Sequence, residues 1–85
     1  MKLPRDLGSA ELAGLLGRFG YAVTRQSGSH MRLTTSLHGE HHVTIPRHTP
    51  LSVGTLSAIL RELTDHLGMD RNTLMETLFS GKQEA

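Results

Sequence analysis

The sequence predicts a single α+β domain in which two helices cover one face of a three-stranded antiparallel sheet. Two observations indicate this class: apolar residues recur at helical spacing towards both ends of the chain and alternate with polar residues in its middle. A chain of 85 residues has room for one core only. The expected order is α-β-β-β-α plus a short helix, with the core at about 9–67, the short helix at about 70–79 and a frayed tail at 81–85.

The first helix is expected to begin at Ser9 and to end before Gly20. Serine is a preferred N-cap, and glycine commonly follows the last helical residue. Between them stand apolar residues at helical spacing, namely Leu12, Leu15, Leu16 and Phe19.

The middle of the chain predicts a three-stranded meander. Its inward-facing residues are expected to be Tyr21 and Val23, then Met31 and Leu33, then Val43 and Ile45. Turns are predicted at Ser27-Gly28 and at residues 37–40, and Pro46 ends the last strand because it cannot donate to the ladder. Turn chemistry leaves the register open. One register, with Leu33 opposite Ile45, would bring His48 level with His30.

A second helix is predicted between Ser52 as N-cap and Gly68, and Asp70 is expected to cap a short third helix. The apolar stripe of the second helix is Val53, Leu56, Ile59, Leu60, Leu63 and Leu67, and the third carries Leu74, Met75, Leu78 and Phe79. Both long helices should pack on the apolar face of the sheet, which leaves its other face open to solvent or ligand. This arrangement resembles the double-stranded RNA-binding domain.

Composition narrows the possible functions. The chain has no cysteine, which excludes disulfides, thiolate zinc sites and a cysteine nucleophile and favours a reducing cytoplasm. No apolar run suits a signal peptide or a membrane span. The net charge is only +1, but residues 18–47 hold four arginines, four histidines and one acid, Glu40. That basic block fits either a nucleic-acid partner or a solvated face.

The most specific segment is residues 20–30, which read GYAVTRQSGSH. This segment resembles the G-aromatic-x-x-x-R-x-x-G-S-H pattern of the HicA family of small toxin ribonucleases. Downstream, residues 43–48 (VTIPRH) resemble the family's strand ending in P-x-H, and residues 54–60 (GTLSAIL) resemble its G-T-L-x-x-I-L helix start. Leu67-Gly68-Met69 onward is similar to the terminal short helix, so the resemblance runs from about Ser9 to Leu78.

The resemblance implies the toxin of a type II toxin–antitoxin pair, an mRNA interferase that cleaves messenger RNA with neither metal nor cofactor. It also implies a HicB antitoxin as partner. Such a protein would inhibit this chain by covering His30 and the basic sheet face, with acids opposite the arginines.

His30 is the residue we expect to be catalytic. Cleavage without a metal takes a proton from a ribose 2′-hydroxyl and delivers another to the leaving 5′-oxygen, and histidine suits both steps. The preceding Gly28-Ser29 turn allows a phosphate to approach backbone N–H groups. Arg32 shares the face of His30 and would stabilise negative charge on phosphate. Substrate binding is therefore assigned to Gly28, Ser29, Arg32, His48 and Arg25, with His48 either a second acid/base or only a phosphate ligand.

Two other functions stay open. One is a non-catalytic RNA-binding module, against which stands the lack of a lysine-rich patch, since the only lysines are Lys2 and Lys82. The other is an inactive subunit of a protein complex. Ser29 has no nearby acid for a catalytic triad, and Tyr21 is expected in the core rather than as a base-stacking platform.

No metal site is expected. The cluster His38, His41 and His42 is predicted to be a solvated hairpin tip, because His41 and His42 point to opposite faces of a strand.

Overall fold

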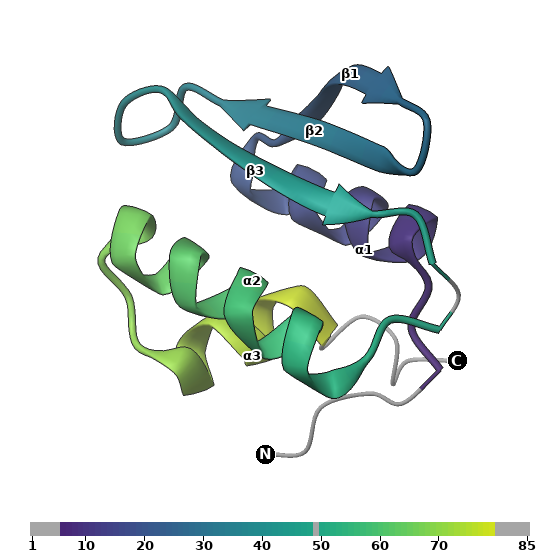
Figure 1. The fold of residues 1–85 in the computed structure, drawn as a ribbon. Helices are drawn as coiled ribbons and strands as arrows, with labels where there is room; N and C mark the ends of the chain where they lie inside the picture. The colour runs from purple at the N-terminus through teal and green to yellow at the C-terminus, as the bar shows by residue number, and fades with distance from the viewer. Residues whose placement is uncertain (1–5, 49, 80–85) are drawn as a thin grey trace.

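The computed structural model describes residues 6–48 and 50–79. Its elements are α1 (Ser9–Leu16), the 3₁₀ turn η1 (Gly17–Phe19), β1 (Ala22–Ser27), β2 (His30–Thr35), β3 (His41–Pro46), α2 (Val53–Leu67) and α3 (Arg71–Phe79). The strands form one antiparallel sheet in the order β1-β2-β3, and α1 and α2 lie beneath the same face of it (Figure 1). The predicted α+β class and element order are confirmed. The predicted frayed tail lies outside the described residues.

One hydrophobic core fills the space between the sheet and the helices. Met31, Leu33, Val43 and Ile45 enter it from the sheet, and α2 contributes Leu56, Ile59, Leu60, Leu63 and Leu67. The third helix adds all four of its predicted apolar residues, Leu74, Met75, Leu78 and Phe79. Full burial of one such side chain stabilises the fold by about 1.5–3 kcal/mol. The core therefore holds α1 and α2 against one sheet face, with α3 packed on these two helices, and the opposite face carries polar side chains.

The first strand departs from the prediction. In β2 and β3 the alternation of buried and exposed residues is as predicted, but every residue of β1 is exposed, including Val23 at 43%. The register also shifts between Val23 and Arg25, which marks a β-bulge. The expectation that Val23 is buried is thus wrong: Val23 pairs with the buried Leu33 and lies on the same side of the sheet, but its side chain stays exposed. Tyr21, just before β1, is buried as predicted.

The helix ends are mostly as predicted. Ser52 caps α2 by accepting the Thr55 N–H at 3.1 Å, and Asp70 caps α3 by accepting the Thr73 N–H at 2.7 Å. That bond lowers the pKa of the Asp70 carboxyl. Val53, in contrast, is 53% exposed and does not belong to the buried stripe, since it lies in the first turn of the helix.

Ser9 is not the N-cap of α1. Gly8 occupies that position, and Ser9 is the first helical residue, buried, with its N–H bonded to the carbonyl oxygen of His48 at 3.0 Å. A backbone carbonyl therefore satisfies one of the first N–H groups of α1, which have no partner within the helix. Gly20 does end the helical segment, with φ +81°. A Cβ there would lie 2.8 Å from Thr35 Oγ1, which donates to the Phe19 carbonyl.

The register of β2 against β3 differs from the suggested one by two residues. Leu33 pairs with Val43 rather than with Ile45, and His30 pairs with Pro46. Both registers keep the apolar residues on one face, so the apolar pattern does not distinguish them. The connecting loop decides the register. It holds a turn closed by the Gly39 N–H on the Ser36 carbonyl at 3.2 Å, with positive φ at His38 and Gly39.

The tip of the β2–β3 hairpin is docked on α2. His66 Nε2 donates to the carbonyl oxygens of Leu37 at 2.9 Å and Gly39 at 3.1 Å. The His66 ring stacks on His41 with centroids 4.3 Å apart, and His41 Nδ1 shares a 2.8 Å hydrogen bond with the Tyr21 hydroxyl. The expectation of a solvated tip is therefore wrong for His41, because α2 lies beneath it.

Acid is expected to destabilise this docking. Burial, His66 and His42 lower the pKa of His41 below its ordinary value of 6.5, and Glu62 opposes them only in part. As the pH falls, His41 is protonated at a higher pH in the unfolded chain than in the folded one. Its contribution to the free energy of unfolding is therefore fully present above about pH 6.5 and is lost as the pH drops through the pKa of the folded state. Burial and Glu62 also raise the pKa of Tyr21 to about 12.

Urea denaturation between pH 7.5 and pH 5 measures this effect. The free energy of unfolding should decrease less between pH 7.5 and pH 5 in the His41→Gln variant than in the wild type, because glutamine cannot take up the proton. An identical pH dependence in the variant and the wild type would contradict this explanation.

Candidate functional site

The candidate site is built around His30, the first residue of β2. A two-residue turn, Gly28-Ser29, joins it to β1, and Ser27 pairs with His30 across that turn. Gly28 has φ +55°, in the left-handed region that favours glycine at the first position of a tight hairpin turn. A Cβ at Gly28 would meet no atom within 4 Å, so the need for glycine here is one of backbone conformation rather than space. The turn and the His30 side chain are exposed.

Ser29 is the nearest side-chain partner of His30. Its hydroxyl lies 3.4 Å from His30 Nδ1, which is long for a hydrogen bond. In the described part of the chain no carboxylate bonds to either residue, so the third member of a Ser–His–acid triad is missing. The contact leaves Nε2 of His30 as the nitrogen directed away from Ser29. The arrangement suits proton transfer by the histidine itself rather than activation of Ser29.

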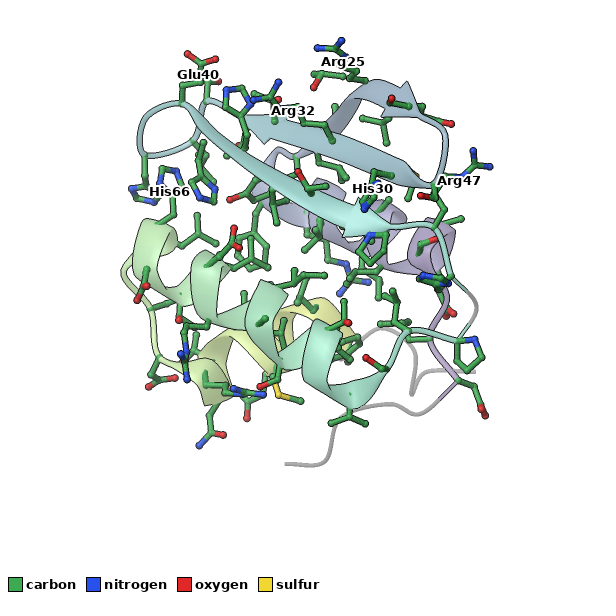
Figure 2. All side chains as sticks on the ribbon, in the orientation of Figure 1. Arg25, His30, Arg32, Glu40, Arg47 and His66 are labelled. Carbon is green, nitrogen blue, oxygen red and sulfur yellow. The ribbon has the colours of Figure 1, made fainter. Side chains whose placement is uncertain are left out.

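Arg25 and Arg32 lie opposite each other on the open face. Strict alternation from Tyr21 would place Arg25 on the core-facing side of β1, but the bulge shifts the phase and pairs it with Arg32. Directly paired residues point to the same side of a sheet, and Arg32 alternates with the buried Met31 and Leu33. Figure 2 shows both arginines above the sheet, away from the helices. The bulge therefore adds a second cation to the face that carries His30.

The opposite end of the open face is occupied by a polar chain of side chains. Thr34 Oγ1 bonds to Thr24 Oγ1 at 2.8 Å and to His42 Nδ1 at 2.7 Å. His42 Nε2 in turn lies 3.3 Å from a carboxylate oxygen of Glu40. In Figure 2 Glu40 and His30 lie at opposite ends of the sheet. The single acid of the basic block is thus kept away from His30.

His48 is not level with His30. Pro46 occupies the position opposite His30, and His48 follows two residues later, beyond the ladder. Its backbone ties β3 to the N-terminus of α1, because its carbonyl accepts the Ser9 N–H. The His48 side chain is exposed.

Arg47 is the residue that the sequence reasoning missed. Its backbone N–H donates to the Ser29 carbonyl at 2.7 Å, and its Nη1 donates to the Gly28 carbonyl at 3.4 Å. Figure 2 shows Arg47 at the same end of the sheet as His30. The signal in the sequence is its place directly after the proline that ends β3, but only the register reveals that this proline faces His30.

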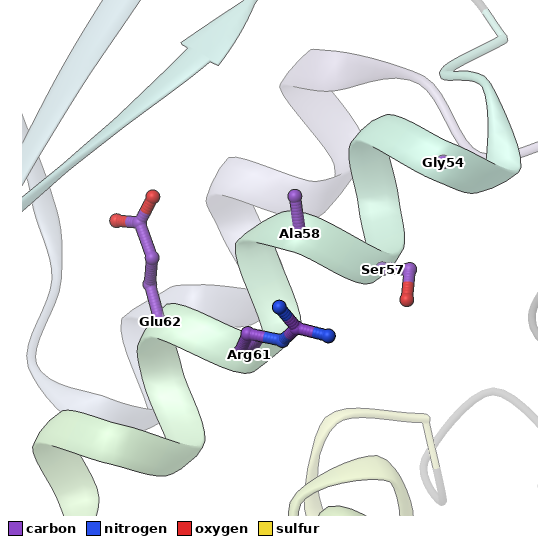
Figure 3. A pocket seen from close by; sticks show the side chains of 5 residues that line it. All are labelled: Gly54, Ser57, Ala58, Arg61 and Glu62. Carbon is purple, nitrogen blue, oxygen red and sulfur yellow. The ribbon is translucent and has the colours of Figure 1, made fainter.

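The hollow found on the described part of the protein lies apart from His30. A shallow hollow of about 430 Å³ on α2 is lined by Gly54, Ser57, Ala58, Arg61 and Glu62 (Figure 3), none of which belongs to the set around His30. Within residues 6–48 and 50–79, no three histidine or acidic side chains are placed to hold a metal ion. None of the helices described is long and apolar enough to cross a membrane.

Comparison with known proteins adds one match. A family model for the HicA toxin of bacterial toxin–antitoxin systems matches residues 9–64, which include α1, the whole sheet and most of α2. Neither the curated proteins nor the solved structures provide a match to the chain.

The Arg25→Ser variant is expected to be more stable than the wild type. It removes one of two like charges that face each other across β1 and β2, an arrangement that costs on the order of 0.5 kcal/mol and that salt screens. Urea denaturation should show the gain at low salt and a smaller gain at high salt. Arg61→Ser, on α2, is the matched control and should give no such gain. A lower free energy of unfolding for Arg25→Ser would contradict the repulsion.

Proposed function

The chain belongs to the HicA family of toxins from bacterial toxin–antitoxin systems, and on this basis we propose that it is an endoribonuclease that cleaves messenger RNA with His30 as its catalytic residue. One observation carries the proposal: an exposed histidine follows a glycine turn on the open face of the sheet, with arginines on the same face and at the same end. This arrangement offers a proton-transfer group, backbone donors and cations to one phosphodiester.

The proposed step is transesterification at phosphorus. The ribose 2′-oxygen loses its proton to a base and forms a bond to phosphorus, the bond from phosphorus to the 5′-oxygen breaks, and an acid protonates that oxygen. The products are a 2′,3′-cyclic phosphate and a 5′-hydroxyl. His30 performs one of the two proton transfers, since an imidazole nitrogen can either accept or donate a proton.

The remaining site residues bind the RNA backbone. The N–H groups of Gly28 and Ser29 approach the phosphate because the turn has no bulky side chain at Gly28. Arg32 and Arg25, paired across β1 and β2, contact phosphates that flank the cleaved one. His48 is proposed as a phosphate ligand rather than the second acid or base, since it lies beyond the ladder that positions His30.

A passive RNA-binding module fits the open face less well. The chain has three aromatic residues, Phe19, Tyr21 and Phe79, and all three are buried. The sheet face therefore offers no phenyl or indole platform on which unpaired bases stack. Few cations line it, and affinity from phosphate contacts grows with the number of charges neutralised. The exposed His30 therefore fits proton transfer to or from the RNA better than passive binding of the RNA backbone.

A HicB-like antitoxin is the proposed partner, because HicA toxins pair with HicB antitoxins. We propose that it covers His30 together with Arg25 and Arg32, with acidic side chains opposite the arginines. The proposed place of action is the cytoplasm, where messenger RNA is present.

The His30→Ala variant is expected to lose RNA cleavage by at least about a hundredfold, which is the contribution of a general acid or base. Cleavage of a purified RNA by the isolated protein measures this, and conditional expression in bacteria measures growth arrest in parallel. The matched control is His38→Asn, an exposed loop histidine with φ +59° that asparagine tolerates. A His30→Ala protein that cleaves at the wild-type rate would contradict the assignment.

Charge reversal is expected to weaken the antitoxin complex. The double variant Arg25→Glu, Arg32→Glu should bind the HicB-like partner more than tenfold less tightly, because acids would then face acids. Calorimetric titration at moderate salt measures the dissociation constant, with Arg61→Glu on α2 as control. Equal affinity of wild type and double variant would place the interface elsewhere.

A further inference from the structure

Arg47 is held at the turn before His30 by two bonds of different kinds. The backbone N–H of Arg47 donates to the Ser29 carbonyl at 2.7 Å, which extends the β2–β3 ladder one step beyond the His30–Pro46 pair. The guanidinium reaches one residue further along the turn and donates from Nη1 to the Gly28 carbonyl at 3.4 Å. The cation is therefore positioned by the same turn that positions His30.

The contact with Gly28 leaves most of the guanidinium's capacity for another ligand. Arginine carries five N–H donors in a planar fork and accepts no bonds, so one long bond to a carbonyl satisfies a small part of it. The side chain is exposed at the sheet end where His30 also lies (Figure 2). A planar, permanently charged fork of this kind suits bidentate bonding to two oxygens of a phosphate.

We infer that Arg47 binds the phosphodiester that is cleaved and holds it beside His30. The inference rests on the proposed function and adds to it a binding residue that the motif around His30 does not include. The backbone of Arg32 lies two residues further along β2 from His30, about 7 Å at the usual rise per residue. In the described part of the chain, neither Arg32 nor Arg25 has a side-chain bond to the turn, whereas the Arg47 side chain bonds to the turn itself. Arg32 and Arg25 hold neighbouring phosphates, while Arg47 contacts the one at which bonds form and break.

The orientation of the carbonyl and N–H groups in the turn supports the assignment of the cleaved phosphate to Arg47. Arg47 occupies the carbonyl oxygens of Gly28 and Ser29, which would otherwise repel an anion at the turn. These two hydrogen bonds place the guanidinium beside the carbonyl oxygens of the turn, and the N–H groups of the turn remain available to a phosphate. Charge that develops on phosphorus oxygens in the transition state is stabilised most by a donor already in place.

The test compares Arg47→Ala, Arg47→Lys and the control Arg61→Ala, which removes an exposed arginine from α2. The tie between Arg47 and Ser29 is made by the backbone, so all three variants keep it and should unfold at the wild-type urea concentration. Cleavage of a fluorescent RNA oligonucleotide gives kcat and KM. Binding of the same sequence with 2′-O-methyl groups, which cannot be cleaved, gives affinity as a function of salt.

Arg47→Ala should lower kcat/KM at least tenfold with an unchanged pH profile, and should reduce the slope of log affinity against log salt by about 0.7, the value for one phosphate contact on a single strand. Arg47→Lys should recover the salt slope but only part of kcat/KM, because lysine cannot bond in a bidentate manner. Arg61→Ala should match the wild type.

Wild-type kcat/KM and an unchanged salt slope for Arg47→Ala would overturn the inference, even if His30→Ala is inactive. If instead His30→Ala remains fully active, the assignment of His30 as the catalytic residue fails, and if the wild type does not cleave RNA, the proposed function fails. In both cases the salt slope of the uncleavable RNA still decides whether Arg47 contacts a phosphate. A loss of antitoxin affinity alone, with RNA binding intact, would also overturn it.

Discussion

The arrangement of the candidate site depends on the register of β2 against β3. At one end of the hairpin this register is fixed by the docked loop, whose carbonyls accept from His66 while His41 stacks on the same ring. At the other end it continues into the bond between Arg47 and Ser29 and then into the tie from His48 to Ser9. A shift of two residues would keep the apolar residues on the same face and yet replace Arg47 at the turn. Parts of the chain far from His30 thus determine its neighbours.

The open face combines like charges that the fold itself does not require. Arg25 and Arg32 are paired across two strands, and the acid of this region, Glu40, lies at the far end with His42. The contacts among side chains on this face stabilise the fold only slightly, so most of the stability comes from the hydrophobic core on the other side of the sheet. An anionic ligand would remove the repulsion, which is a physical reason for proposing that RNA and an acidic antitoxin surface bind here.

Most of the fold was predictable from the sequence because its signals are local. Helical spacing with Ser52 and Asp70 as caps predicts α2 and α3, and strict alternation predicts β2 and β3. The exposed edge strand, the bulge that turns Arg25 and the β2–β3 register were not predictable, since each depends on loop conformation or on what the helices leave uncovered. His30 was proposed from its motif, whereas the role proposed for Arg47 rests on a contact between segments 18 residues apart.

The most direct test of the account is to locate bound RNA on the protein by backbone NMR. Titration with a short 2′-O-methyl RNA, which binds without being cleaved, should shift the amide signals of Gly28, Ser29, His30 and Arg47 first and those of Arg25 and Arg32 with them. The signals of α2 and α3 residues such as Arg61 and Arg71 should stay in place. Shifts confined to α2 and α3, with the turn before His30 unaffected, would contradict the account.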